Sequence, residues 1–468
     1  MKSKERFIWI LIVFVLLIAS LLGIFTKNVF AGSISSDFPS MQKFITVLNR
    51  IKTDYVDESK IDEKKLINGA IKGMLDALED PHTTYLSEKD MEDMQDTTTG
   101  SFGGVGMIIQ EKDDYIVVVT PIEDTPAYRK GMKPGDLLIS VDGKSLKGVK
   151  VSEAAKMLRG TPGTTVKVEF IRNDMKYEVE FVRAKIDVPT VKYDIINNKY
   201  GYLRITQFTG TTDSHVKKAL EEFNSKKKIE AIIIDLRFNP GGLLSQAIKI
   251  ADMFQDEGVI VSTKGRNYQN EVWKASKFDT LLSNDVKIVV LVDGGSASAS
   301  EIFAGAIKDH NRGILVGEKT FGKGSVQTIV PLGKDGFKIT IAKYYTPADI
   351  SIEGVGIQPD VEVKDITLTD EELVFFKKLL KDKIVENYIK KNSNPTKLEI
   401  ESYAKEIIQK GYLINIDYLK RYIKKEAEFD DEKRPVYDLE YDIQLQKCVD
   451  ILDKNLIEYR DGKYYLKK

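Results

Sequence analysis

Residues 288–309 read IVVLVDGGSASASEIFAGAIKD, and this stretch decides the fold of the central part of the chain. A short apolar run predicts a buried strand, the small residues after it predict a turn, and a helix is expected to about His310. Residues 231–242, AIIIDLRFNPGG, have the same order, with a helix expected from Leu243 to Phe254. Two such units predict an α/β core in which helices flank the sheet. Loops at strand ends are the usual place for chemistry.

The segment before this core, residues 98–185, has a strand-like period. Its glycine-rich turn GGVGM at 103–107 enters a strand, and KPGDLLISVDG at 133–143 contains a turn, a strand and a hairpin signal. Together with a closing helix at 151–159, this order resembles a PDZ domain. The resemblance implies that a peptide is added as a strand to a sheet edge. Its C-terminal carboxylate would then be bound by backbone N–H groups at Gly104, Val105, Gly106 and Met107.

The N-terminus carries a membrane signal. Residues Phe7 to Phe25 contain no charge and are close to the ~20 residues that span a bilayer as a helix. Three basic residues precede them, so the N-terminus is expected in the cytoplasm and the rest of the chain outside. Residues 1–31 are therefore predicted to be a cytoplasmic stub and anchor. Cleavage after Ala31 is the alternative, and it would release a secreted protein.

Helical periodicity marks both flanks of the chain. In residues 38–97, apolar residues recur at three- and four-residue steps, and a second helix is expected to end before Asp80-Pro81. We expect residues 54–97 to pack on the peptidase-like core at 186–364. Residues 365–468 are predicted to form a helical extension, in which we identify no chemistry.

Composition excludes several function classes. The 468 residues carry 70 Lys plus Arg against 71 Asp plus Glu, and this balance gives no reason to expect nucleic-acid binding. One cysteine, Cys448, can form neither an internal disulfide nor a thiolate metal site. Only three histidines are present, so we expect no metal and no cofactor.

Ser298 is the candidate nucleophile. It lies between a predicted buried strand and a helix, among small residues that leave its oxygen accessible. A helix N-terminus favours developing negative charge, and the N–H of Ala299 would point at an oxyanion. The run does not fit the G-x-S-x-G pattern of other hydrolases. The alternative is that Ser296 and Ser298 merely cap the helix.

Three other features support chemistry at Ser298. Gly241-Gly242 follows the other buried strand and can present a second N–H, although a tight turn explains it equally well. Lys323 stands between two glycines, and Gln327 follows it on a strand-like segment, which predicts that both side chains lie on one face. An ordinary lysine, with a pKa near 10.4, is a poor base, but burial without a carboxylate partner favours the neutral amine.

The stretches at 235–242, 295–309 and 317–327 together resemble the C-terminal processing peptidases, and the likeness runs from about Asp54 to Asp360. The resemblance implies a ClpP/crotonase-like core and a serine–lysine dyad. Ser298 would be the nucleophile, Lys323 the base and Gln327 the residue that orients the base. Ala299 and Gly241, or Gly242 in its place, would form the oxyanion hole. One departure is that Pro347 is followed by Ala348 where the family commonly has glycine.

The expected function is thus that of a membrane-anchored endopeptidase acting outside the cytoplasm on proteins with apolar C-termini. The resemblance also implies a homodimer or higher oligomer. Arg159, at the end of the predicted PDZ helix, could couple ligand binding to domain position, but a solvated arginine is the simpler interpretation. Two alternatives remain open at this point. One is a catalytically silent PDZ scaffold, and the other is a P-loop at 317–323, which lacks the required Ser or Thr after the lysine.

Overall fold

The computed structural model describes residues 38–112, 114–122, 125–133, 135–172, 174–226, 229–428 and 435–467. The chain divides into two compact units, Met1–Tyr85 and Leu86–Lys468. The anchor predicted at residues 7–25 lies outside the described residues. Within those residues, no helix combines the length and the apolar character needed to cross a bilayer.

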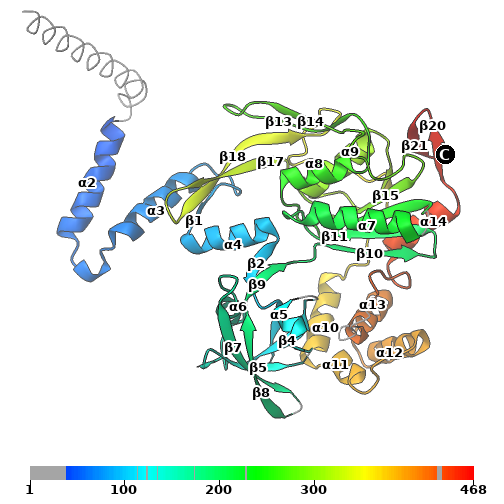
Figure 1. The fold of residues 1–468 in the computed structure, drawn as a ribbon, viewed down its shortest axis with the longest axis horizontal. Helices are drawn as coiled ribbons and strands as arrows, with labels where there is room; N and C mark the ends of the chain where they lie inside the picture. Colours follow the sequence, from blue (N-terminus) through cyan, green and yellow to red (C-terminus); the bar gives the residue numbers. More distant parts are fainter. Residues whose placement is uncertain are drawn as a thin grey trace, which may run out of the picture. The chain divides into compact units, whose positions relative to one another are not determined.

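The described part of the first unit is mostly helical, as predicted, but strand β1 (Thr84–Leu86), which the sequence did not predict, begins at its end (Figure 1). Helix α2 spans Phe38–Asp54 and α3 spans Glu63–Asp76, with a short 3-10 helix at Glu58–Lys60 between them. The Asp62 side chain caps α3 by accepting the N–H of Lys65.

The second unit begins with α4 (Glu88–Thr99) and continues into a small β-rich module. Its main sheet has the order β3-β4-β5-β7-β8, with β6 paired to β5, and a separate ribbon joins β2 to β9. The strands are β2 (Ser101–Gly104), β3 (Met107–Lys112), β4 (Tyr115–Pro121), β5 (Leu137–Val141), β6 (Lys144–Ser145), β7 (Thr165–Arg172), β8 (Met175–Val182) and β9 (Ala184–Asp187). Helices α5 (Pro126–Arg129) and α6 (Val151–Leu158) complete the module, whose apolar core includes Ile116, Leu138 and Phe181.

A six-stranded sheet of order β10-β11-β12-β15-β16-β19 follows. Strand β10 is antiparallel to β11 and the other neighbours are parallel. The strands are β10 (Val191–Ile196), β11 (Tyr200–Ile205), β12 (Ala231–Asp235), β15 (Lys287–Val292), β16 (Ile314–Gly317) and β19 (Val361–Glu362). Helices α7 (Thr212–Lys226), α8 (Leu244–Asp252) and α9 (Ala299–Asp309) follow β11, β12 and β15. Every residue of β12 is buried, because a sheet covered on both faces takes continuous apolar strands.

An antiparallel sheet packs beside these layers. It pairs β14 (Glu271–Lys274), β13 (Val259–Lys264), β18 (Gly336–Tyr345) and β17 (Ser325–Pro331) in that order. The register of β17 on β18 shifts between Val326 and Gln327, which marks a β-bulge.

The C-terminal extension is divided in two. Helices α10 (Asp370–Lys381), α11 (Ile384–Ile389), α12 (Lys397–Gln409) and α13 (Ile416–Ala427) share their own apolar cluster. Helix α14 (Ile443–Asp453) and the hairpin β20 (Ile457–Arg460) and β21 (Lys463–Leu466) belong instead to the core of the six-stranded sheet (Figure 1). The prediction of a purely helical extension was therefore wrong for its last part, where short polar-flanked strands carry too little periodicity to be recognised.

Candidate active site

Ser298 stands at the turn between β15 and α9, as predicted. Its backbone has φ 53° and ψ −112°, a region that residues other than glycine rarely adopt. Such strain costs about 1–3 kcal/mol and persists where the surrounding structure enforces it. Ser298 is the N-cap residue of α9, and its N–H donates to Glu301, but an N-cap residue ordinarily has extended backbone angles, so capping alone does not explain this conformation. Strained strand-to-helix turns are used elsewhere to present a nucleophilic serine.

The three serines of the SASAS run differ in what their hydroxyls do. Ser296 Oγ donates to the carbonyl of Leu236 at 2.8 Å, and Ser300 Oγ donates to the carbonyl of Asn239 at 3.0 Å. Both side chains are fully buried. Their hydroxyls are committed to holding the loop after β12, which leaves Ser298 as the serine of this run that is suited to chemistry.

The glycine loop after β12 lies directly against Ser298. A Cβ placed on Gly241 would lie 2.8 Å from Ser298 Cβ and 2.9 Å from the nitrogen of Ala299. Those separations are shorter than any real Cβ contact, and Gly241 also has φ +98°. The N–H of Ala297 donates to the carbonyl of Asn239 at 3.0 Å and ties the two loops together. Glycine is required here by both the close approach and the backbone conformation.

The three predicted oxyanion donors differ in whether their N–H group already has an acceptor. The N–H of Gly241 donates to Asn239 Oδ1 at 2.9 Å and would have to leave this acceptor to bind an oxyanion. Neither the N–H of Ala299 nor that of Gly242 has an acceptor within the part of the chain that the structure describes. The first N–H groups of a helix lack intrahelical partners, so Ala299 is suited to bind an external oxygen.

Glu301 joins the serine loop to the lysine loop. Its Oε2 accepts the backbone N–H groups of Ser298 at 2.8 Å and of Lys323 at 2.9 Å. Its Oε1 accepts the N–H of Gly322 at 2.7 Å and the hydroxyl of Thr320 at 2.6 Å. Four donors on one fully buried carboxylate hold the backbone of the predicted base beside that of the predicted nucleophile.

Burial raises the pKa of the Glu301 carboxyl, although the hydrogen bonds from Thr320, Gly322, Ser298 and Lys323 act in the opposite direction. Glu301 was not among the site residues predicted from the sequence. Its place in the first turn of α9, three residues after Ser298, is the signal that points to a carboxylate folding back on the turn.

Lys323 is half-buried in a loop that needs its glycines. Gly322 has φ +91°, and a Cβ on Gly324 would lie 2.4 Å from the nitrogen of Glu353. The Glu353 side chain also accepts the N–H of Gly324 at 2.7 Å. The two glycines on either side of Lys323 therefore allow close backbone packing, and this packing fixes the position of the Lys323 backbone.

Gln327 lies on β17, and its Nε2 donates to Thr340 Oγ1 on β18 at 3.3 Å. Lys323 and Gln327 do not lie on one continuous strand, although the predicted shared face required it. Lys323 precedes the strand, and a bulge separates Val326 from Gln327, so simple alternation does not relate the two side chains.

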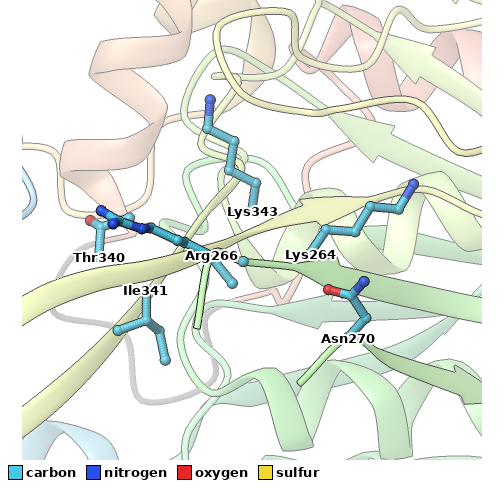
Figure 2. A pocket seen from close by; sticks show the side chains of 8 residues that line it. Lys264, Arg266, Asn270, Thr340, Ile341 and Lys343 are labelled. Atoms are coloured by element: carbon cyan, nitrogen blue, oxygen red, sulfur yellow. The ribbon is translucent and has the colours of Figure 1, made fainter. Parts of the chain in front are cut away.

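Thr340 also lines a surface pocket of about 510 Å³ with a basic wall (Figure 2). Lys264 and Lys343 come from paired positions on β13 and β18, and Figure 2 shows Arg266 extending toward Thr340. Like charges opposite one another on neighbouring strands are unfavourable, and Lys264 is matched here by an ion pair with Asp349 at 2.5 Å. Sequence reasoning did not single out this pocket.

The predicted carboxylate loop of the β-rich module runs from the end of β2 to the start of β3. Gly106 has φ +81°, and its carbonyl accepts the Thr125 hydroxyl at 2.9 Å. Among the described residues, the N–H groups of Val105 and Gly106 have no acceptor. Strand β3 lies at the edge of its sheet, with α6 beside it. An open strand edge next to N–H donors is the arrangement that strand addition of a peptide requires.

Arg159 forms the C-cap of α6, and its guanidinium lies 4.5 Å from the centroid of the Phe102 ring. This cation–π contact connects the end of α6 to β2.

Comparison with known proteins gives consistent matches. The family model "Peptidase family S41" matches residues 199–363, the PDZ domain model matches 103–181, and the model "Activating protease CtpB N-terminal domain" matches 27–90. The chain is 41% identical over 375 residues to a carboxy-terminal-processing protease of Bartonella bacilliformis, covering 77% of this chain and 85% of that protein. It is 37% identical over 371 residues to the carboxy-terminal processing protease CtpA of Bacillus subtilis, covering 78% of each.

Among solved structures, the photosystem II D1 C-terminal processing protease is 30% identical, with a TM-score of 0.41. That comparison covers 69% of this chain and 92% of the other.

The prediction of a PDZ domain at 98–185 is confirmed by the PDZ domain model, which matches residues 103–181.

Proposed function

Because the chain belongs to the family of carboxy-terminal-processing proteases, serine-type peptidases of family S41 that carry a PDZ domain, we propose that it cleaves proteins with a Ser298–Lys323 dyad. The observation that carries this proposal is the shared carboxylate oxygen of Glu301, which holds the backbone of both residues. The strained turn at Ser298 and the close approach of Gly241 support it.

The reaction follows from the roles of these groups. The neutral amine of Lys323 takes the hydroxyl proton of Ser298 as Oγ attacks the substrate carbonyl. The resulting ammonium gives that proton to the leaving nitrogen, and the peptide bond breaks to give an acyl-enzyme and a neutral amine. The amine then takes a proton from a water molecule as the water oxygen attacks the ester. The bond between the acyl carbon and Ser298 Oγ breaks, and the ammonium returns the proton to Oγ. Gln327 orients the lysine during both steps.

Charge develops on the carbonyl oxygen in each tetrahedral intermediate. The N–H of Ala299, together with that of Gly241 or Gly242, would donate to this oxygen. For Gly241 this means exchanging Asn239 for the oxyanion, whereas Gly242 can donate without such an exchange.

The substrate class follows from two surfaces. The PDZ domain would bind exposed C-termini through Val105, Gly106 and their neighbours, by addition to β3. Near the dyad, Phe238 and Phe321 are 66% and 64% exposed, and the N–H of Phe321 is bonded to the carbonyl of Ser296. Aromatic rings on the loops beside the nucleophile favour substrates with apolar residues.

Location and assembly are part of the same proposal. The uncharged stretch Phe7 to Phe25 would anchor the protein, with the peptidase outside the cytoplasm. The exposed apolar residues Met41, Phe44 and Ile45 on α2 support a homodimer or higher oligomer.

The test is proteolysis of an unstructured protein with an apolar C-terminal tail, followed by mass spectrometry of the fragments. Wild type should cleave it, and both Ser298→Ala and Lys323→Ala should not, while thermal unfolding shows that the variants are folded. Cleavage by the Ser298→Ala protein at the wild-type rate would overturn the dyad.

A further inference from the structure

The end of the chain forms one layer of the peptidase core. Leu445, Cys448 and Ile451 of α14 are buried against the six-stranded sheet, in the same cluster as Ile233 and Val289. The hydroxyl of Tyr200 donates to Asp453 at 2.8 Å, and Lys287 Nζ donates to Asn455 at 2.6 Å. The sheet face covered by α14 would be exposed without this segment.

Arg237, at the start of the glycine loop, is held jointly by the sheet and by this segment. Its Nε and Nη2 donate to the two oxygens of Asp235 at 3.0 and 2.7 Å. Its Nη1 and Nη2 donate to the two oxygens of Asp442 at 2.8 and 2.6 Å, and Nη1 also donates to Gln444 at 2.9 Å. All five N–H groups of the guanidinium are thereby used, and three of them go to the C-terminal segment.

Asp442 and Gln444, the C-terminal partners of Arg237, are each fixed by a further hydrogen bond. Asp442 Oδ1 accepts the N–H of Leu445 and caps α14, and Gln444 Nε2 donates to the carbonyl of Val363 at 2.7 Å. Arg237 and Gln444 are buried, so water cannot replace a lost partner. A planar guanidinium bound on two sides by carboxylates has one orientation, which also fixes the backbone from which it extends.

That backbone leads straight to the predicted oxyanion hole. Phe238 follows with φ 58°, and its N–H donates to Asp293 on the serine loop at 2.9 Å. Asn239 then binds the N–H of Gly241 and accepts the N–H of Ala297. A shift of Arg237 would therefore also shift Phe238 and Asn239, and through them the groups that contact Ser298.

We propose that Asp442 and Gln444 are positioning residues for the peptidase site, acting through Arg237 on the glycine loop at 238–242. This inference rests on the proposed function. It makes the last part of the chain a component of the active site, which is then complete only when α14 is docked on the sheet.

The test compares two variants in the same helix and its cap. Asp442→Asn removes the charge and the paired geometry, but asparagine still caps a helix as well as aspartate does. Ile451→Ala is the control, because Ile451 is buried on the same sheet and its aliphatic side chain cannot accept a hydrogen bond from Arg237. Both variants should lower the unfolding temperature, so kcat and KM are measured for the same tailed substrate well below either unfolding temperature.

Displacement of a catalytic group by about 1 Å costs on the order of 100-fold in rate, so Asp442→Asn should lower kcat by about 10- to 100-fold. KM should change much less than kcat, because the PDZ domain is untouched, although Phe238 lies on the loop that Arg237 positions. Ile451→Ala should keep a kcat close to that of wild type. Equal kcat values in the two variants, or a change in KM alone, would overturn the inference.

Gln444→Leu provides a second variant if Asp442→Asn does not fold. It removes one of five acceptors and keeps both carboxylates, so kcat should fall in the same direction by a smaller factor, and an unchanged kcat contradicts the proposal. Failure of this inference is distinct from failure of the dyad. An active Ser298→Ala protein refutes the dyad, whereas an inactive Ser298→Ala protein beside a fully active Asp442→Asn protein refutes only the positioning role.

Discussion

The backbone N–H groups of Ser298 and Lys323 donate to the same oxygen atom, Oε2 of Glu301. The two residues belong to loops that follow different strands of the six-stranded sheet, β15 and β16. One buried carboxylate therefore determines the separation of the two backbones from which nucleophile and base extend.

Replacing Glu301 by glutamine should separate these loops. In glutamine, one of the two accepting oxygens is replaced by an NH2 group, which donates hydrogen bonds. The side chain can then no longer accept all four hydrogen bonds that Glu301 accepts. We expect kcat to fall about 100-fold, the effect typical of displacing a catalytic group by about 1 Å. Glu318→Gln is the control, because in the described part of the chain its carboxylate accepts a single hydrogen bond, from the N–H of Asp365. Steady-state kinetics on the tailed substrate measures both, and equal kcat values would contradict the role given to Glu301.

Replacing Lys323 by arginine tests whether a neutral amine is the base. Arginine has a side chain of similar length but carries a permanent positive charge, because it is not deprotonated in proteins. We expect the variant to fold normally and to be as inactive as Ser298→Ala. Substantial turnover by the arginine variant, measured by fragment release, would mean that the lysine acts through its charge and not as a base.

Gly241→Ala should abolish activity. Its Cβ would lie 2.6 Å from the Ala297 carbonyl oxygen and 2.8 Å from Ser298 Cβ, and φ +98° is itself unfavourable for alanine. The serine turn must then shift, and kcat should fall at least about 100-fold, as for loss of an oxyanion donor. Gly294→Ala, on the neighbouring loop, has no atom within 4 Å of its Cβ and should keep its activity. If both variants were active, the close packing of Gly241 against the Ser298 turn would not be needed for catalysis.

Gly106→Ala should weaken peptide binding by the PDZ domain. A Cβ there would lie 2.3 Å from Thr125 Cβ, at φ +81°. Gly148→Ala has a similar φ of +71° but open space around its Cβ, so it separates the clash from the backbone strain. Titration of a labelled peptide with an apolar C-terminus should give a higher Kd for Gly106→Ala only. A matching increase in Gly148→Ala would point to general loss of stability.

The Asp235–Arg237 pair should make stability depend on acid pH. Burial raises the pKa of Asp235, but the charge and hydrogen bonds of Arg237 outweigh it, so the pKa lies below its usual value. A lowered pKa gives stability that is fully present above the unfolded value of about 3.9 and is lost as the pH falls through the folded value. The unfolding temperature of wild type should exceed that of Asp235→Asn at neutral pH, and the difference should shrink below about pH 4. Glu88→Gln removes an exposed ion pair with Lys334 and should have little effect at any pH.

The sequence by itself determined the parts of this protein that depend on local pattern. Buried strands at 231–235 and 288–292 followed by small-residue loops are visible as apolar runs, and the sheet has both. The glycine-rich turn at 103–107 enters a strand, as predicted, since β3 begins at Met107. Ser298, Lys323 and Gln327 could be named because a recognisable motif surrounds each one.

Only the tertiary structure decided which of these motifs meet and what holds them. Glu301 binds across to residues 320–323, and Asp442 binds Arg237 from the far end of the chain. Such contacts have no sequence period, because they depend on how strands are ordered and helices docked. The bulge before Gln327 likewise interrupts the alternation of side chains along β17, and nothing in the amino-acid composition predicts it. Burial removes water as a competitor for the Glu301 carboxylate, so its hydrogen bonds determine where the two loops lie.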